Sequence, residues 1–401
     1  RFHASETAIE RPRMEHACVV LGSATPSLEA FYACESGKYE LLRLKNRSMK
    51  QSLPEVYVTD MREELKKGNR SILSDRLKEL MEDRLQKKEQ MMLFLNRRGY
   101  AGFVSCRACG YVVKCPHCDV SLSVHRGGKM VCHYCGYETA GVQNCPSCGS
   151  PYIGGFRAGT QQIEELVKRQ FPQARVLRMD LDTTKNKGGH EKILAQFADE
   201  EADIMIGTQM IVKGHDFPNV TLVGVLAADM SLYSDDYRSG ERTFQLLTQA
   251  AGRAGRGRSK GEVVIQTYSP DHYSIQMAAK QDYEGFYEKE MNYRDLMGYP
   301  PAAQLMAVLM TGADEEMLQT AAEYLKKYAI RVMDEGTCQV IGPASPYVGK
   351  VNDVYRKILY LKSEDYQMLI RIKNHMERYI EINRGFANMR IQFDFNPMSV
   401  F

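Results

Sequence analysis

Four pairs of cysteines with the spacing Cys-x-x-Cys lie within residues 106–148 and contain most of the cysteines of this 401-residue chain. The pairs are Cys106 with Cys109, Cys115 with Cys118, Cys132 with Cys135, and Cys145 with Cys148. Each pair can place two thiolates on one metal ion, and two pairs complete the tetrahedral four-thiolate site typical of structural zinc. Eight thiolates therefore predict two zinc ions. Because neither site would keep an open coordination position, both zincs are expected to be structural.

The four pairs can be combined in three ways, and the residues between the second and third pairs favour one of them. The stretch DVSLSVHRGGKMV (119–131) is typical of a β-hairpin with RGGK at its turn, which would bring Cys115 and Cys118 beside Cys132 and Cys135. The first and fourth pairs would then share the other zinc in a nested arrangement. For any single pair, a chance spacing or a redox motif is the alternative. The histidines of this block are interpreted as hydrogen-bonding or exposed residues, since eight sulfurs suffice: His117, His125 and His133.

A second segment with chemical potential is QAAGRAGRGRSKG (249–261), in which arginines alternate with glycines. Helical spacing would place Arg253 and Arg256 on one face, and Gly252 and Gly255 would remove side chains that obstruct a close approach. Arginines presented in this way suit a phosphate group, because a guanidinium donates paired hydrogen bonds and keeps its charge. The alternative is a basic turn at the end of a helix.

The composition is that of a globular protein, with 44% hydrophobic and 26% charged residues, and the length predicts two or three domains. No run of about 18 apolar residues is present, which predicts that no segment spans a membrane. Eleven cysteines without a secretory signal indicate a reducing compartment. The net charge of +3 neither favours nor excludes a polyanionic partner. The opening RFHASETAIERPRMEHACVV lacks an initiator Met and indicates a fragment.

Strands and helices alternate through the first two thirds of the chain. Most of the strands are nearly continuous apolar runs, which predicts a parallel sheet with helices on both faces. Because ligands of such sheets gather at the carboxyl ends of the strands, the loops after residues 95, 180, 207 and 229 are the expected sites. Strands are expected near 17–28, 91–95, 174–180, 203–208, 220–229 and 261–268, and helices at 73–88, 159–171, 189–199 and 239–254.

The last third of the chain has a different order of elements. A Tyr-rich helical connector ends at Pro300 and Pro301, and a domain boundary is expected near 303. The order strand-helix-strand-strand-helix-strand then predicts a compact α+β, ferredoxin-like domain of about 100 residues. Its segment GPASPYVGKVNDVYRK (342–357) mixes Lys, Arg and Tyr, which is compatible with binding a single strand or a protein tail. A purely structural domain is the alternative.

Three segments together resemble signature motifs of superfamily-2 helicases: GSATP the third, GTQMIVKGHDF the fifth and QAAGRAGR the sixth. In these helicases two RecA-like lobes enclose ATP, and arginines of the second lobe reach the phosphates. The phosphate-cradling pattern G-x-x-x-x-G-K-[ST] and an Asp-Glu-x-His run are both missing from the sequence. The chain therefore resembles the back part of a helicase.

The cysteine block narrows the resemblance, because it follows FLNRRGY inside the expected second lobe. With GSATPSLE, GTQMIVKGHDFPNVTLVGVLAAD, TQAAGRAGRG and GYPP, it makes the chain similar to the primosomal replication-restart helicases (PriA family) over essentially all its residues. The resemblance implies an ATP-dependent, Mg²⁺-requiring 3′-to-5′ DNA helicase that restarts replication at stalled forks and nucleates primosome assembly. The departures are the missing N-terminal DNA-binding domain, phosphate loop and Asp-Glu-x-His box, so this chain alone is not expected to hydrolyse ATP.

The resemblance also implies roles for individual residues. Arg253 and Arg256 would sense the phosphates, and Gln249 would contact the nucleotide or the neighbouring lobe. The remaining roles are Gly214 and Asp216 near the nucleotide, Ser23, Ala24 and Thr25 in coupling the lobes, and Arg97, Arg98, Thr208 and Lys213 on the DNA backbone. For Arg97 and Arg98 the alternative to DNA contact is an exposed charge at a strand end.

The implied partners are forked and single-stranded DNA, single-strand-binding protein and primosome components, for a monomeric, cytoplasmic, nucleoid-associated bacterial protein. Two other functions compete: a zinc-ribbon nucleic-acid-binding scaffold, and a different superfamily-2 repair translocase. The intact QAAGRAGR disfavours the first and the nested cysteine block disfavours the second. The expected domains are the tail of helicase lobe 1 (1–45), lobe 2 (46–270) with a zinc insertion (104–150), the connector (271–303) and the C-terminal domain (304–401).

Overall fold

The computed structural model divides the chain into two compact units, Leu44–Glu290 and the combination of Arg1–Arg43 with Met291–Phe401. None of the described helices has the length and apolar character that a membrane span requires. The structure describes residues 4–44, 53–95, 103–118, 120–125, 128–154, 159–180, 183–184, 188–208, 211, 217–233, 236–257 and 259–398.

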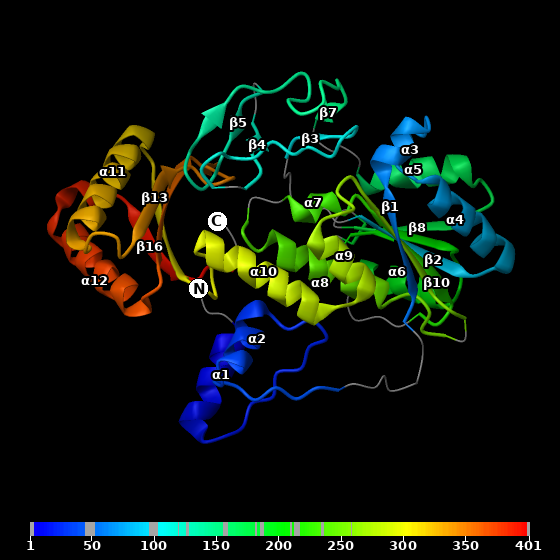
Figure 1. The fold of residues 1–401 in the computed structure, drawn as a ribbon, viewed down its shortest axis with the longest axis horizontal. Helices are drawn as coiled ribbons and strands as arrows, with labels where there is room; N and C mark the ends of the chain where they lie inside the picture. Colours follow the sequence, from blue (N-terminus) through cyan, green and yellow to red (C-terminus); the bar gives the residue numbers. More distant parts are fainter. Residues whose placement is uncertain are drawn as a thin grey trace. The chain divides into compact units, whose positions relative to one another are not determined.

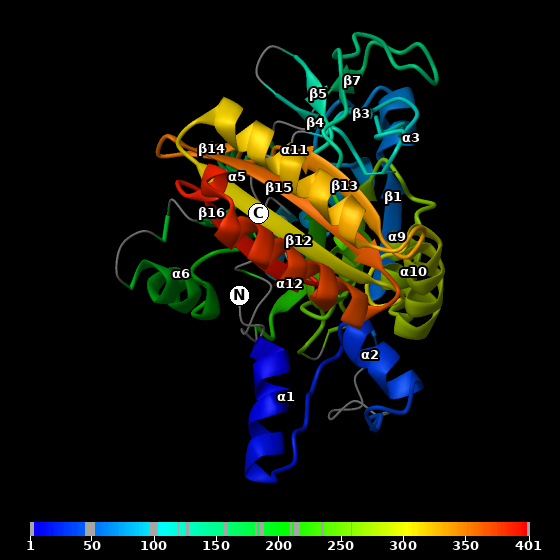
Figure 2. The ribbon, with the colours of Figure 1, turned by 90° about the vertical axis from the view of Figure 1, so that its left-hand side faces the viewer.

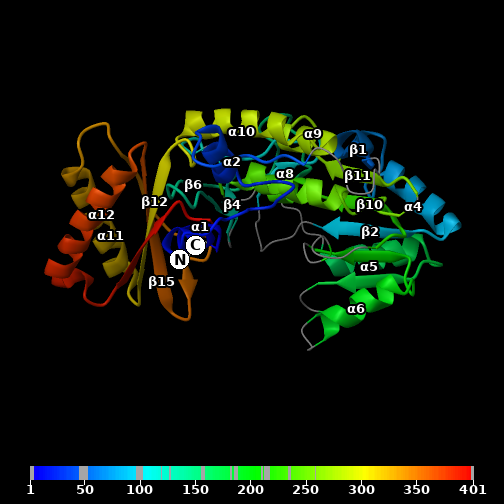
Figure 3. The same cartoon turned by 90° about the horizontal axis from the view of Figure 1, so that it is seen from below.

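The larger unit is built on a six-stranded sheet in the order β1-β11-β10-β2-β9-β8. All five strand pairings are parallel, which confirms the predicted parallel sheet. The neighbouring strands β1, β11, β10 and β2 can be followed in Figure 3. The strands are β1 (Glu55–Asp60), β2 (Gln90–Leu95), β8 (Val176–Met179), β9 (Ile204–Gly207), β10 (Val220–Leu226) and β11 (Glu262–Thr267).

Helices cover both faces of this sheet. Right-handed crossovers place α4 (Asp75–Lys87) and α5 (Thr160–Gln170) on one face, and α6 (Gly189–Ala198) and α8 (Ser239–Ala251) on the other. The first face is closed by a core in which side chains of α4 and α5 pack on alternate residues of β2. The shorter helices are α3 (Met61–Lys66) and α7 (Asp229–Leu232), and α9 (Tyr273–Lys280) and α10 (Tyr283–Met297) follow β11.

Three expectations about single elements were wrong or incomplete. The strand expected at the start of 17–28 does not form, and Val20 and Leu21 are exposed between helices α1 (Ala4–Glu15) and α2 (Leu28–Glu35). The helix expected to run to residue 254 ends at Ala251, because the glycine-rich segment turns there. Strand β1, an edge strand that is only partly buried, was not predicted.

A cysteine-rich insertion, residues 103–154, lies between β2 and α5 (Figure 1). The predicted hairpin is present, since β4 (Ser123–Val124) pairs antiparallel with β5 (Met130–Val131). β6 (Glu138–Thr139) extends it, and β3 (Ser105–Cys106) pairs with β7 (Ile153–Gly154). Strands of two residues cannot enclose a sizeable apolar core.

The C-terminal domain has the predicted α+β order and an antiparallel sheet, β13-β15-β12-β16. This is the strand order of a ferredoxin-like fold, and α11 and α12 pack on the same face of the sheet (Figure 2). The two-residue strand β14 (Lys350–Val351) and the 3-10 helix η1 (Arg384–Phe386) were not expected. The other elements are β12 (Gln304–Gly312), α11 (Glu315–Val332), β13 (Gln339–Ala344), β15 (Val354–Ser363), α12 (Tyr366–Ile382) and β16 (Arg390–Phe395).

Candidate zinc centres and arginine turn

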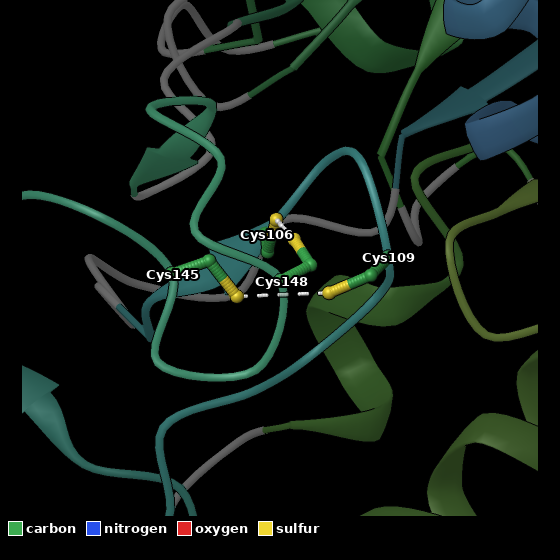
Figure 4. A group of neighbouring side chains, drawn as sticks. All are labelled: Cys106, Cys109, Cys145 and Cys148. Carbon is green, nitrogen blue, oxygen red and sulfur yellow. Dashed lines mark hydrogen bonds between the residues drawn. The ribbon is translucent and has the colours of Figure 1, made fainter.

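The eight cysteines of the insertion form two groups of four, in the nested arrangement that the hairpin predicted. The first group is Cys106, Cys109, Cys145 and Cys148, and the second is Cys115, Cys118, Cys132 and Cys135. Within each group all Sγ atoms lie within 4.8 Å of one another. Figure 4 shows that the two halves of the first group come from separate loops and point toward one another.

The sulfur spacing fits a tetrahedral zinc ion. The Sγ atoms of Cys106 and Cys148 are 3.7 Å apart, and those of Cys109 and Cys145 are 3.6 Å apart. In the second group, Cys115 and Cys135 are also separated by 3.6 Å. Four sulfurs at about 2.3 Å from one zinc would be about 3.8 Å from each other, whereas a disulfide requires about 2.05 Å. The residues present therefore fit zinc and not disulfides.

Glycines shape three of the four cysteine pairs. Gly110, Gly136 and Gly149 each follow the first cysteine of a pair by four residues, and each donates its N–H to the carbonyl of that cysteine. Their φ angles lie between +72° and +79°, a backbone conformation that side chains with a Cβ rarely adopt. This turn folds each pair back so that both sulfurs face one point.

Three thiols of the second group, those of Cys115, Cys132 and Cys135, favour their neutral form when no cation is bound. Burial raises the pKa of Cys115, and it raises the pKa of Cys135 to about 12. A hydrogen bond with Cys118, together with burial, raises the pKa of Cys132. Zinc must displace these protons to bind, so its affinity for this group falls as the pH falls.

Each of the two described groups consists of four cysteines, and the nearby histidines make other contacts. The Nε2 atoms of His125 and His133 are 3.1 Å apart. The ring of His117 meets that of Tyr137 edge-on, with centroids 5.5 Å apart.

The arginine turn, residues 252–257, follows α8. Arg253 and Arg256 are half-buried in it, and Arg256 Nε donates to the Gly252 carbonyl at 2.8 Å. Gly255 has φ +72°, and a Cβ at this position would lie 2.3 Å from the Gly261 nitrogen. The glycine at 255 is therefore required by the packing of the turn on its own chain, in addition to any clearance for a ligand.

The arginine turn lies at the amino ends of β10 and β11, whereas the loops after residues 95, 180, 207 and 229 follow the carboxyl ends of strands. The Gly255 N–H donates to the carbonyl of Val220, the first residue of β10. A Cβ on Gly257 would lie 2.3 Å from the Pro218 carbonyl oxygen. The turn lies there because α8 runs back along the sheet before the turn begins. The turn thus packs against the end of the GTQMIVKGHDFP segment.

The other predicted site residues are distributed over both units or lie outside the described residues. Gln249 is half-buried in the last turn of α8. Thr208 directly follows β9, and its carbonyl accepts from the Ile211 N–H. In the smaller unit Ser23 Oγ accepts from the N–H of the buried Thr25 at 3.1 Å. Outside the described residues lie Arg97, Arg98, Lys213, Gly214 and Asp216.

One polar residue at the carboxyl edge of the sheet was not singled out from the sequence. Asp229 follows β10 and is buried, and its carboxylate accepts from Thr267 Oγ1 and from the Tyr268 N–H, both at 2.9 Å. Burial raises the pKa of Asp229. The sequence feature that could have identified Asp229 is its position as an acidic residue at the end of the apolar run VTLVGVLAAD. These contacts join the ends of β10 and β11.

Three family models match the chain. "PriA DNA helicase Cys-rich region (CRR) domain" matches residues 115–139, and "Helicase conserved C-terminal domain" matches residues 155–258. "Primosomal protein N C-terminal domain" matches residues 295–398. The three regions are the second cysteine group, the lobe that carries the arginine turn, and the C-terminal domain.

Curated relatives match along the whole chain. The Replication restart protein PriA of Bacillus subtilis is 48% identical over 402 residues, which covers 99% of this chain and 49% of that protein. The protein of the same name from Synechocystis is 40% identical and covers 100% and 48%, respectively. The chain thus spans about half the length of these relatives. A solved structure of S. cerevisiae Dbp5 bound to RNA and ADP BeF3 is 13% identical, with a TM-score of 0.35, and covers 73% of this chain and 59% of that one.

Proposed function

The chain belongs to the PriA family of replication restart proteins, and from that premise we propose that it forms the second lobe, zinc module and C-terminal domain of an ATP-dependent 3′-to-5′ DNA helicase acting at stalled forks. The observation that carries the proposal is the contact between the arginine turn and Pro218. It brings together the two segments that resemble the fifth and sixth helicase motifs.

ATP with Mg²⁺ would bind between this lobe and a first lobe that supplies the phosphate loop. Arg253 and Arg256 would stabilise the negative charge that develops on the phosphates during hydrolysis. Gln249, one turn earlier on α8, would contact the nucleotide or the other lobe. Gly214 and Asp216, which precede Pro218 in the chain, would approach the sugar and phosphates.

DNA would be held mainly through its phosphate backbone, which suits a protein that recognises fork structure rather than sequence. Thr208 follows β9 at the carboxyl edge of the sheet, and Arg97 and Arg98 follow β2 in the chain. Together with Lys213 these residues would contact the backbone. Ser23 and Thr25 would couple the closing of the lobes to movement along the strand.

The two zinc ions would be structural, and the binding partners would be those of the PriA family. Its partners would be forked and single-stranded DNA, single-strand-binding protein and primosome components, with the protein acting as a monomer in the bacterial cytoplasm at the nucleoid. The C-terminal domain would contribute to DNA or protein-tail binding.

The experiment that tests the proposal uses a chimaera in which this chain replaces the matching half of the Bacillus subtilis relative. We expect the chimaera to hydrolyse ATP in the presence of forked DNA and to unwind it from 3′ to 5′. Arg253→Ala and Arg256→Ala should each lower the rate of ATP hydrolysis by about 10³-fold, the scale of an arginine that stabilises transferred phosphate. Fork binding, measured by fluorescence anisotropy, should change less than twofold.

Arg175→Ala is the matched control, because Arg175 is exposed and pairs with Asp203, away from the turn. It should leave hydrolysis unchanged. A chimaera that binds forked DNA but hydrolyses ATP equally well without Arg253 would contradict the proposed role of the turn. Fork binding with no ATP hydrolysis in any variant would favour the scaffold function instead.

A further inference from the structure

Three side chains of the insertion, those of Ser121, Tyr134 and Phe103, contact the helicase lobe near the second cysteine group. Ser121 Oγ donates to the Tyr233 carbonyl at 2.6 Å. The hydroxyl of Tyr134 accepts from the Tyr237 N–H at 3.3 Å. Phe103 packs beside the ring of Tyr233, with centroids 5.3 Å apart. The insertion therefore contacts Tyr233 and Tyr237, on the path from α7 to α8, directly.

Tyr134 is fixed by the cysteine group itself. It lies between Cys132 and Cys135, two cysteines of the second group, and only 1% of it is exposed. A zinc ion that holds both sulfurs also fixes the backbone on each side of the tyrosine. Ser121 is held beside the same group, because it forms an isolated β-bridge with Lys114, the residue before Cys115. Both contacts thus depend on the folded cysteine group.

The contacted segment is continuous with α8. Asp236 Oδ1 accepts from the Arg238 N–H at 3.0 Å, and the Asp236 carboxylate pairs with Arg242 at 2.6 Å. Thr243 Oγ1 donates to Ser231 Oγ at 2.8 Å, which ties α8 to α7. A restraint on Tyr233 and Tyr237 is therefore transmitted to the first turns of the helix through Asp236 and Ser231.

Helix α8 runs from the carboxyl ends of the strands to their amino ends. It begins beneath the insertion, near the carboxyl end of β10, and its 13 residues lead to the arginine turn at the amino end of the same strand. A helix of this length spans about 20 Å. A rigid helix that is fixed at its start also limits the movement of Gln249 and the arginines at its end.

The first cysteine group contacts other elements. Arg62 of α3 donates to the Cys109 carbonyl at 3.4 Å, and a Cβ on Gly110 would lie 2.3 Å from the Tyr268 carbonyl oxygen. These contacts reach α3 and the end of β11, whereas those of the second group reach the start of α8. Loss of one cysteine group should therefore affect different helices and strands of the lobe from loss of the other.

We propose that Tyr134 and Ser121 are positioning residues, through which the second zinc group restrains α8 and thereby places the arginine turn. The restraint of α8 stands on the contacts above. The consequence for ATP hydrolysis rests on the proposed function of the arginines. Loss of zinc from the second group would loosen the arginine turn, and loss from the first would not.

The test is hydrogen exchange of the zinc-loaded chain, followed by mass spectrometry. The variant Tyr134→Phe/Ser121→Ala removes both hydrogen bonds and keeps all eight cysteines. Exchange of peptides from α8 and residues 249–255 should become about tenfold faster, the scale expected when buried hydrogen bonds that hold a helix are lost. Peptides of α4, on the other face of the sheet, should not change. Metal analysis should still give two zincs per chain.

Tyr137→Phe is the matched control, because Tyr137 lies in the same hairpin segment and its ring packs on His117 rather than on the lobe. Its exchange should equal that of the wild type. Faster exchange confined to residues 233–238, or no change at all, would overturn the proposal, since the contacts would then anchor only the insertion.

A second readout separates this proposal from the proposed function. In the chimaera the double variant should hydrolyse ATP about tenfold more slowly, with fork binding unchanged. If the wild-type chimaera hydrolyses no ATP, the proposed function fails while the exchange result still decides whether the second zinc group restrains α8. Wild-type rates in a variant whose α8 exchanges faster would overturn the link from helix to arginines.

Discussion

The cysteine-rich insertion and the C-terminal domain are both built on antiparallel strands, but the strands have very different lengths. Those of the insertion have two residues each, whereas β12 has nine and β15 has ten. The long strands present enough apolar side chains to form one core with α11 and α12. The two-residue strands of the insertion cannot form such a core, so its loops are held together by the cysteines. The same kind of sheet is thus stabilised by apolar burial in one region and by ligands for a metal in the other.

Removal of the metal should produce the largest difference between the stabilities of the insertion and of the C-terminal domain. A four-thiolate zinc site contributes on the order of 10 kcal/mol to the folding of a small module. We expect a chelator to abolish protection from hydrogen exchange throughout residues 103–154 and to leave that of β12 and β15 unchanged. Equal protection of the insertion with and without zinc would show that its small apolar core suffices.

A core truncation should produce the reverse pattern. Leu359 of β15 is fully buried between the sheet and its helices. Leu359→Ala should lower the free energy of unfolding of the C-terminal domain by about 2–5 kcal/mol, through lost burial and the cavity that remains. Urea unfolding followed by exchange measures this cost, and metal analysis should still give two zincs. The exposed Leu296→Ala is the matched control and should cost little.

Acid should destabilise the larger unit through a histidine near the insertion. Burial, with a smaller contribution from the charge of Lys114, lowers the pKa of His272 to about 4. The unfolded chain, with a pKa near 6.5, then binds more protons than the folded one between these values. Stability is therefore complete above pH 6.5 and is lost as the pH falls toward 4, by about 2 kcal/mol at pH 5.

His272→Asn isolates this contribution from the protonation of thiolates. His272 caps α9 by accepting from the Ser274 N–H, and asparagine can accept the same bond without titrating. The variant should lose about 2 kcal/mol less than the wild type between pH 7.5 and 5 in urea unfolding. An identical pH dependence in both proteins would assign the acid effect to other groups.

The smallest expected difference lies inside the insertion, between its two zinc groups. Cys148 of the first group is exposed, whereas three cysteines of the second are buried and the fourth is half-buried. A chelator should therefore extract the first zinc about tenfold faster, a barrier difference of about 1.4 kcal/mol. Absorbance of a zinc-sensitive dye should show two phases, of which Cys148→Ser removes the fast one and Cys132→Ser the slow one. A single phase would make the groups equivalent.

The cysteine pairing could be predicted from the sequence because it depends on local geometry. A hairpin between Cys118 and Cys132 leaves few ways to bring eight sulfurs together. The parallel sheet was predictable for a similar reason, since its buried strands are short apolar runs such as that of β2. The order of the C-terminal elements likewise followed from periodicity along the chain.

Features that depend on contacts between distant residues were not predictable in this way. The edge strand β1 is fixed by pairing with β11, about 200 residues later, and its own half-buried pattern is weak. The position of the arginine turn depends on where α8 ends and on the Val220 carbonyl. The roles proposed for Tyr134 and Ser121 could be recognised only in the folded structure, because their hydrogen-bond partners lie about 100 residues away in the chain.

The pairing of β3 with β7 has a consequence for how such a protein can change over evolutionary time. Ser105 lies opposite Gly154, so the insertion leaves the lobe and returns to it through neighbouring backbone positions. A segment whose two ends adjoin can be gained, lost or exchanged as a cassette, while the sheet that receives it needs only a short bridge. In this protein the contacts of Ser121 and Tyr134 with the lobe add a second connection, so an exchanged segment would have to supply them as well.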